Sequence, residues 1–193
     1  SQEGILTSIE TYHPEVARAC LKAGANAINF TGTEYSEEMY RVVADFDAAI
    51  IICYMQGKHA RNLENFDFSM DKDPLDLIYD YFGKEIETAT KLGANKIFID
   101  PAVGLGYKNF YYKHKNVPTR LRYQIETLLG SFRLRKLGFP VFSAIPTPLE
   151  VFGEDVRSAQ VFTAVFAVLG KSDTIRTHEV SKVKAILESL ALL

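Results

Sequence analysis

The chain has 193 residues, 47% of them hydrophobic and 24% charged, and a formal net charge of −2. This length suits one domain with a sizeable core, and the near-neutral charge excludes a general attraction to nucleic acid or anionic membranes. No apolar run nears the ~18 residues of a membrane span and no signal peptide is evident, so we expect a cytoplasmic protein with no membrane or nucleic-acid partner.

Short apolar runs alternate with longer amphipathic segments along the whole chain. In chain order, the predicted strands span Ile5–Ile9, Ala27–Phe30, Ala48–Tyr54, Lys96–Asp100, Val141–Ile145 and Thr174–Thr177. The predicted helices that follow them span Pro14–Gly24, Ser36–Asp45, Pro74–Leu92, Thr119–Lys136, Val156–Leu169 and Lys182–Leu192. Apolar residues recur at helical spacing in the second set, whereas the first set consists of continuous apolar runs. The sequence thus predicts a strand followed by a helix six times.

The residues at or just beyond the predicted strand ends are polar or otherwise unusual. They are Glu10, Asn29, Tyr54, Asp100, Pro146 and Arg176. Apolar strands that alternate with helices are typical of a parallel sheet. The carboxyl ends of such strands meet at one face of a (β/α)8 barrel, where active sites are built, but spread along an edge in a doubly wound sheet. We therefore expect an α/β protein with a TIM (β/α)8-type barrel, incomplete, with about six βα units in this chain.

Four stretches carry most of the unusual residues: TSIETYHPEVARACLKAGANAINF, ICYMQG, FIDPAVGLGY and IRTHEV. In this order and spacing they resemble the motifs of the dihydropteroate synthase family, and the resemblance covers nearly the whole chain. It implies a TIM barrel that binds a pterin. It also implies a transferase of folate biosynthesis, which joins a pterin diphosphate to p-aminobenzoate.

The resemblance implies four pterin-binding residues. Asp100 matches the family aspartate that holds the pterin ring, and a carboxylate can accept two adjacent hydrogen bonds from the amino-pyrimidine edge. Asn29 matches the family asparagine, whose amide can both donate and accept. Glu10 stands where the family has an aspartate, one methylene shorter, and Met55 could lie against a ring face.

Two further residues match the family's anion-binding positions. The resemblance implies that Arg176 and His178 bind the diphosphate, since a guanidinium fork suits phosphate oxygens and a histidine adds a donor. No catalytic side chain and no protein metal ligand is assigned, so Mg²⁺ is expected only as a companion of a diphosphate substrate. The family also implies a homodimer.

The chain departs from the family pattern at two places. The serine–arginine–lysine turn after the seventh barrel strand is replaced by SAIPTPLEV, from Ser143 to Val151, so the family's pterin-contacting lysine has no equivalent. The first two βα units, with the loop that binds magnesium and diphosphate, are absent. We therefore expect residues 1–193 to form a single pterin-binding domain, the C-terminal part of a longer chain.

Several alternatives stay open at this point. The chain could be a non-catalytic pterin- or folate-binding domain, or a methyltetrahydropterin methyltransferase-type domain. Asp100 could simply cap the loop that follows it, and Asn29 could brace its own loop through Thr31 or Thr33. Arg176 and His178 could pair structurally with acidic neighbours such as Glu10 or Glu179.

Overall fold

The computed structural model describes residues 4–65, 73–103, 117–146, 152 and 155–192. Its strands are β1 (Ser8–Thr11), β2 (Ala27–Phe30), β3 (Ala49–Cys53), β4 (Gly57–His59), β5 (Asn62–Leu63), β6 (Ile97–Asp100), β7 (Phe142–Ala144) and β8 (Thr174–Arg176). Its helices are α1 (Pro14–Lys22), α2 (Ser36–Asp45), α3 (Pro74–Lys91), α4 (Val117–Gly130), the 3-10 helix Ser131–Leu137, α6 (Val156–Leu169) and α7 (Val180–Leu190). No helix in these ranges is long and apolar enough to cross a membrane.

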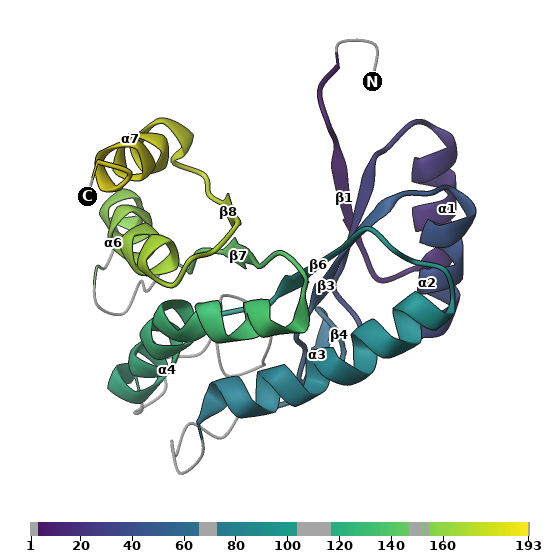
Figure 1. The fold of residues 1–193 in the computed structure, drawn as a ribbon, viewed down its shortest axis with the longest axis horizontal. Helices are drawn as coiled ribbons and strands as arrows, with labels where there is room; N and C mark the ends of the chain where they lie inside the picture. The colour runs from purple at the N-terminus through teal and green to yellow at the C-terminus, as the bar shows by residue number, and fades with distance from the viewer. Residues whose placement is uncertain (1–3, 66–72, 104–116, 147–151, 153–154, 193) are drawn as a thin grey trace.

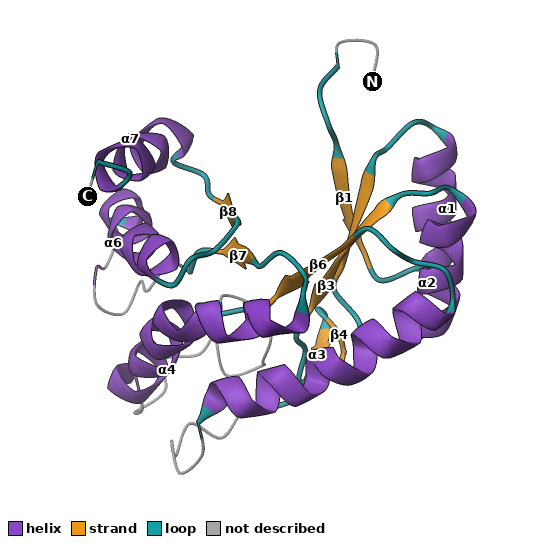
Figure 2. Cartoon of the chain, viewed as in Figure 1, coloured by secondary structure: helices purple, strands orange, loops and turns teal. Residues whose placement is uncertain are grey.

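Six parallel strands form the wall of the fold. β1, β2, β3 and β6 pair in that order, and β7 pairs with β8. The two groups meet where the N–H of Ile99 donates to the Pro140 carbonyl at 3.0 Å, beside a parallel bridge between Ile99 and Val141. The helices line the outer side of this wall in chain order (Figures 1 and 2). This arrangement confirms the expected partial barrel.

Alternation along the strands separates an outer from an inner face. Ile28, Ile50, Ile52 and Ile99 point to the outer side and are fully buried in the main core, which the sheet shares with α1, α2 and α3. A second, smaller core joins α4, α6 and α7 around Leu128. The outer face therefore carries the packing, and the inner face is left for other groups.

Two predicted elements differ from the structure by three residues or more at one end. The helix predicted to run to Lys136 ends as an α-helix at Gly130 and continues as a 3-10 helix, because Leu75 of α3 packs so closely that a Cβ at Gly130 would overlap its Cδ1 atom. The first strand begins at Ser8 rather than Ile5, because its partner β2 begins only at Ala27.

The sequence analysis also missed the hairpin of β4 and β5. Gly57 has a φ of 126° there, and a Cβ at this position would overlap the Asn62 carbonyl oxygen. The ring of His59 stacks on Tyr12, with centroids 4.1 Å apart. The hairpin therefore lies beside the end of β1.

Candidate functional site

Four side chains from neighbouring strands meet on the inner face near the carboxyl ends of the strands. Glu10 of β1 is in register with Asn29 of β2, and Cys53 of β3 is in register with Asp100 of β6. Asn29 is in register with Ile51, two residues before Cys53. Because side chains alternate along a strand with a period of two, all four lie on one face.

Asp100 is the centre of this group and is only 2% exposed. Its Oδ1 atom accepts the Ala102 N–H at 2.7 Å, and its Oδ2 atom lies 3.6 Å from Cys53 Sγ. A backbone hydrogen bond from Ala144 of β7 also reaches the carboxyl. Ala102 has a φ of 51°, so the carboxylate supports an unusual backbone turn. Asp100 therefore does cap the loop that follows it, as the alternative interpretation predicted. This role is compatible with a ligand contact through the remaining lone pairs of the carboxylate.

Burial dominates the electrostatics of this carboxyl group. It raises the pKa of Asp100 from 3.8 to about 7, against the lowering effects of the Ala102 N–H, the Cys53 thiol and the positive charge of Arg176. Burial also raises the pKa of the Cys53 thiol, and the charge of Asp100 adds to this. A buried carboxyl whose pKa is raised toward neutrality, at the carboxyl end of a barrel strand, is typical of a functional site.

Asn29 of β2 is half-buried and lies two strands from this carboxyl, with Cys53 of β3 between them. Its Oδ1 atom lies 3.2 Å from Cys53 Sγ, so the amide oxygen is turned toward the thiol and the NH2 group away from it. The alternative partner Thr33 instead donates to the Gly57 carbonyl at 2.9 Å. Asn29 is thus tied to Cys53, and the loop after β2 is held by other contacts.

Arg176 ends β8, three strands along the wall from Cys53, and its side chain is exposed. Within the described ranges, no hydrogen bond or ion pair holds its guanidinium, yet its charge lowers the pKa of Asp100. The pairing with Glu179 is not found, since that carboxylate lies 3.5 Å from both Arg157 and Lys182.

His178 and Met55 are placed differently from the central group. His178 is exposed, and its backbone N–H donates to Gln160 Oε1 at 2.9 Å. Met55 follows β3, is 5% exposed and belongs to the main core. No described contact brings Met55 to Asp100, so its ring contact stays a prediction, as do the ligand roles of the other residues.

Three residues near the site were missed by the sequence analysis. Cys53 was not among the predicted site residues, because its position opposite Asp100 depends on the register between β3 and β6. The buried Gln124 of α4 donates to the Val103 carbonyl at 2.7 Å, and the buried Gln160 of α6 accepts from Thr177 Oγ1 at 2.8 Å. A glutamine in the mostly apolar sequence of α6 was the available signal for Gln160. Both glutamines hold the chain just beyond a site strand.

Part of the expected site lies outside the described residues. This applies to the glycine loop after Val103, with Gly104, Gly106 and Tyr107, and to the Thr147–Val151 part of the SAIPTPLEV stretch. Within the described part of that stretch, Ile145 and Pro146 are buried. The Pro146 carbonyl accepts a hydrogen bond from the Thr163 hydroxyl at 3.1 Å.

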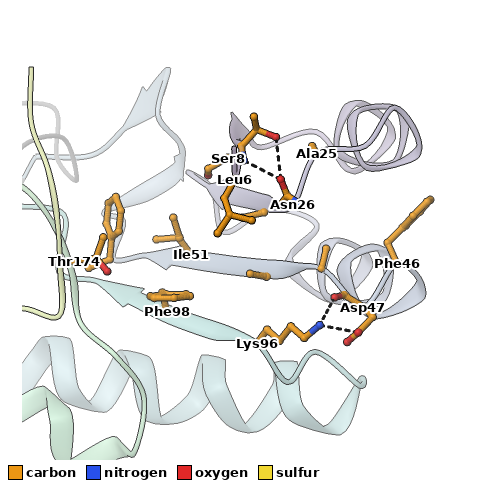
Figure 3. A pocket seen from close by; sticks show the side chains of 15 residues that line it. Leu6, Ser8, Ala25, Asn26, Phe46, Asp47, Ile51, Lys96, Phe98 and Thr174 are labelled. Atoms are coloured by element: carbon orange, nitrogen blue, oxygen red, sulfur yellow. Dashed lines mark hydrogen bonds and ion pairs between the residues drawn. The ribbon is translucent and has the colours of Figure 1, made fainter. Parts of the chain in front are cut away.

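A cavity of about 550 Å³ lies at the opposite, amino-terminal end of the strands. Ile51, Phe98 and Phe142 supply apolar walls (Figure 3). At its rim, the Thr7 N–H donates to Asn26 Oδ1 at 2.9 Å, and Lys96 pairs with Asp47 at 2.7 Å. None of the six predicted ligand residues lines it, so the cavity is separate from the Asp100 group.

The described residues contain no group of three or more His, Cys, Asp or Glu side chains that could hold a metal ion. A single buried carboxylate with an amide beside it suits a flat, hydrogen-bonding organic ring better than a cation. Together with the strand-end position, this defines a ligand-binding α/β barrel.

Comparison with known proteins places this barrel in a family. Residues 1–178 match the family model described as pterin binding enzyme, and the chain belongs to that family. It is 29% identical over 201 residues to a dihydropteroate synthase of Streptococcus pyogenes, covering 98% of this chain and 67% of that protein. It is 30% identical over 191 residues to the folic acid synthesis protein of Pneumocystis carinii, covering 91% of this chain and 24% of that protein.

Solved structures confirm the fold. The dihydropteroate synthase of Thermus thermophilus in complex with 6HMPPP superposes with a TM-score of 0.78 at 22% identity, covering 100% of this chain and 72% of that one. The same enzyme in complex with 4-aminobenzoate gives a TM-score of 0.81 at 20% identity, covering 100% of this chain and 76% of that one. The chain thus spans about two thirds to three quarters of these synthases.

Proposed function

We propose that this chain is a dihydropteroate synthase-type domain, which binds a pterin and serves a transferase that joins a pterin diphosphate to p-aminobenzoate. One observation carries the proposal: the buried Asp100 carboxylate lies at a strand end, is linked through Cys53 to Asn29, and has the charge of Arg176 near enough to lower its pKa. The names of the streptococcal relatives, and the 6HMPPP and 4-aminobenzoate bound to the Thermus enzyme, support it.

The site residues would share the work of binding. Ionised Asp100 would accept two adjacent N–H groups from the amino-pyrimidine edge of the pterin, and the Asn29 amide would meet another part of the same ring. Glu10 is exposed beside Asn29, close enough for its charge to raise the pKa of the Cys53 thiol. Arg176 and His178 would bind the diphosphate oxygens.

The reaction would need little covalent chemistry from the protein. The bond between the pterin methylene carbon and the diphosphate oxygen breaks, the electron pair leaves with the diphosphate, and the amine nitrogen of p-aminobenzoate bonds to that carbon. The amine then loses a proton. The protein would hold the reactants in line and stabilise the departing anion through Arg176.

Magnesium would enter with the diphosphate rather than through protein ligands. The described residues offer no cluster of three or more His, Cys, Asp or Glu side chains that could hold the ion.

Pterin binding without transfer is the second candidate. One feature favours this candidate. The buried residues Ile145 and Pro146 follow β7 at the place where the family has its lysine-bearing turn. A methyltransferase-type activity would use the same pocket but would need no anion site, so Arg176 speaks against it.

Calorimetric titration distinguishes these candidates. The 193-residue chain is titrated at fixed magnesium with a pterin and with its diphosphate. Tighter binding of the diphosphate supports the synthase-type proposal, and equal binding supports a pterin-binding domain. If neither binds, the proposal fails for this chain.

Three further features remain predictions for the same protein: a single domain over residues 1–193, a homodimer and a cytoplasmic location. Sedimentation equilibrium of the chain checks the homodimer directly.

A further inference from the structure

The Cys53 thiol sits between the two polar groups that would read the pterin edge. Its sulfur lies 3.2 Å from Asn29 Oδ1 on one side and 3.6 Å from Asp100 Oδ2 on the other. Cys53 is 4% exposed, so bulk water cannot replace these contacts. A thiol has a single proton and is a weak donor, and both facing atoms are oxygen acceptors.

The surroundings keep this thiol protonated. Its pKa is raised by burial first and by the negative charges of Asp100 and Glu10 next. The S–H group is therefore a donor over the whole neutral pH range, and it approaches the Asn29 oxygen more closely than the Asp100 oxygen.

The donor matters because an asparagine amide has two opposite orientations. With the oxygen on the thiol side, the NH2 group points away from Cys53 and can donate to a ligand. With the amide turned over, the ligand would meet an acceptor instead. The structure has the first orientation, with Asn29 Oδ1 3.2 Å from Cys53 Sγ, and a protonated thiol that donates to this oxygen stabilises it.

We propose that Cys53 is a positioning residue, whose S–H donates to Asn29 Oδ1 and so holds the amide with its NH2 group facing the bound ring. The ligand class rests on the proposed function, namely a pterin-like ring that offers an acceptor to Asn29 and N–H groups to Asp100. The orientation of Asn29 itself does not depend on that function.

Two substitutions at this position separate hydrogen bonding from packing. Cys53→Ser keeps a donor of similar size, whereas Cys53→Ala removes it. Cys20→Ala is the matched control, because Cys20 is the other free cysteine and lies half-buried on α1. Loss of a hydrogen bond of this kind changes an equilibrium by about three- to tenfold. We expect Cys53→Ala to weaken pterin binding by about that factor, and Cys53→Ser and Cys20→Ala to leave it within about twofold.

The pH dependence of pterin binding distinguishes a hydrogen-bonding role of Cys53 from a packing role, because packing alone would not shift it. The Cys53 thiol lowers the pKa of Asp100, so its removal should shift the loss of pterin affinity to higher pH, and serine should prevent the shift. Glu10 on β1 and Arg176 on β8 are the other charged groups acting on this pair among the described residues. Both are unchanged in all three variants.

The ligand-free chain gives an independent test through the NMR resonances of the Asn29 side-chain amide. We expect one sharp NH2 pair in the unaltered chain and in Cys53→Ser, and a shifted or broadened pair in Cys53→Ala. If the unaltered chain binds no pterin, the proposed function fails, and this spectrum still decides the role of Cys53. The inference is overturned if Cys53→Ala and Cys53→Ser give the same spectra, or if both weaken binding equally.

Discussion

Asp100 combines two roles that usually conflict. Its carboxylate supports the turn at Ala102 and at the same time lies at the carboxyl end of β6, where the proposed pterin would bind. Burial makes the ionised form costly and brings the pKa to about 7. Hydrogen bonds from ligand N–H groups would offset part of this desolvation cost, because they replace the hydrogen bonds to water that the buried carboxylate has lost.

Pterin affinity should therefore depend on pH around neutrality. Ionised Asp100 accepts two hydrogen bonds, whereas the protonated form turns one acceptor into a donor, so we expect affinity to fall as the pH drops through about 7. Calorimetry between pH 5.5 and pH 8.5, taken as roughly 1.5 units on either side, measures the effect. Asp100→Asn should bind weakly at every pH, and the same pH dependence in that variant would exclude Asp100 as the titrating group.

The same pKa shift has an opposite consequence for folding. The folded chain holds the Asp100 proton more tightly than an unfolded chain, in which the pKa is near 3.8. The stability contribution of this group is therefore present at acid pH and is lost as the pH rises through about 7. Ligand binding and folding thus favour different protonation states of one residue.

Arg176 should discriminate between ligands with and without a diphosphate. Its guanidinium has no described partner, so Arg176→Ala removes a charge without leaving a buried group unpaired. We expect binding of the pterin diphosphate to weaken by about tenfold or more, and binding of the bare pterin to change by about threefold at most. Lys182→Ala, at a surface ion pair of α7, is the control. Equal losses for both ligands would remove the anion role of Arg176.

At the scale of elements, the close contact between α4 and α6 fixes where the last two strands lie. Gly170 ends α6, and a Cβ there would overlap the Leu128 carbonyl oxygen and lie 2.9 Å from Ser131 Oγ. The backbones touch at this point, and the second core begins one turn away. Glycine is required by this approach rather than by its own φ of −77°.

Gly170→Ala should therefore destabilise the chain. Forcing apart two packed helices costs about 1–3 kcal/mol of unfolding free energy, which urea denaturation followed by circular dichroism can measure. Gly83→Ala is the matched control, because a Cβ at Gly83 on α3 meets nothing within 4 Å. That variant should gain about 0.5–1 kcal/mol. Equal stability of the two variants would mean that α4 and α6 can separate freely.

Whether an element could be predicted depends on whether the residues that determine its bounds lie within the element or elsewhere in the chain. Ala27–Phe30, Ser36–Asp45 and Val156–Leu169 were predicted with the observed bounds, because their apolar patterns and start residues are local. The break at Gly130 depends on Leu75, which lies far earlier in the chain, and no local pattern records it. Asp100 and Asn29 could be predicted to lie on one face from their strand-end positions, but the thiol between them depends on strand register.

At the scale of the whole molecule, the inner face of the barrel has two separate ends. The polar end carries Asn29, Cys53 and Asp100, and the apolar end is the cavity of about 550 Å³ bordered by Phe98 and Phe142 (Figure 3). Ile51 lies between them in register and is 6% exposed. In the proposed function this division would separate ligand binding from packing, as in barrels whose active site lies at one face.

A larger side chain at the apolar end should therefore be tolerated without an effect on the ligand. Ala49 begins β3, is half-buried and lines the cavity, so Ala49→Leu has space to enter. We expect its unfolding free energy to stay within about 1 kcal/mol of the unaltered chain, whereas Ala17→Leu, fully buried on α1, should lose about 1–3 kcal/mol through overpacking. Urea denaturation measures both, and calorimetry should give the same pterin affinity for Ala49→Leu as for the unaltered chain. A weakened affinity in that variant would mean that the two ends are coupled through Ile51, because it is the side chain that lies between them.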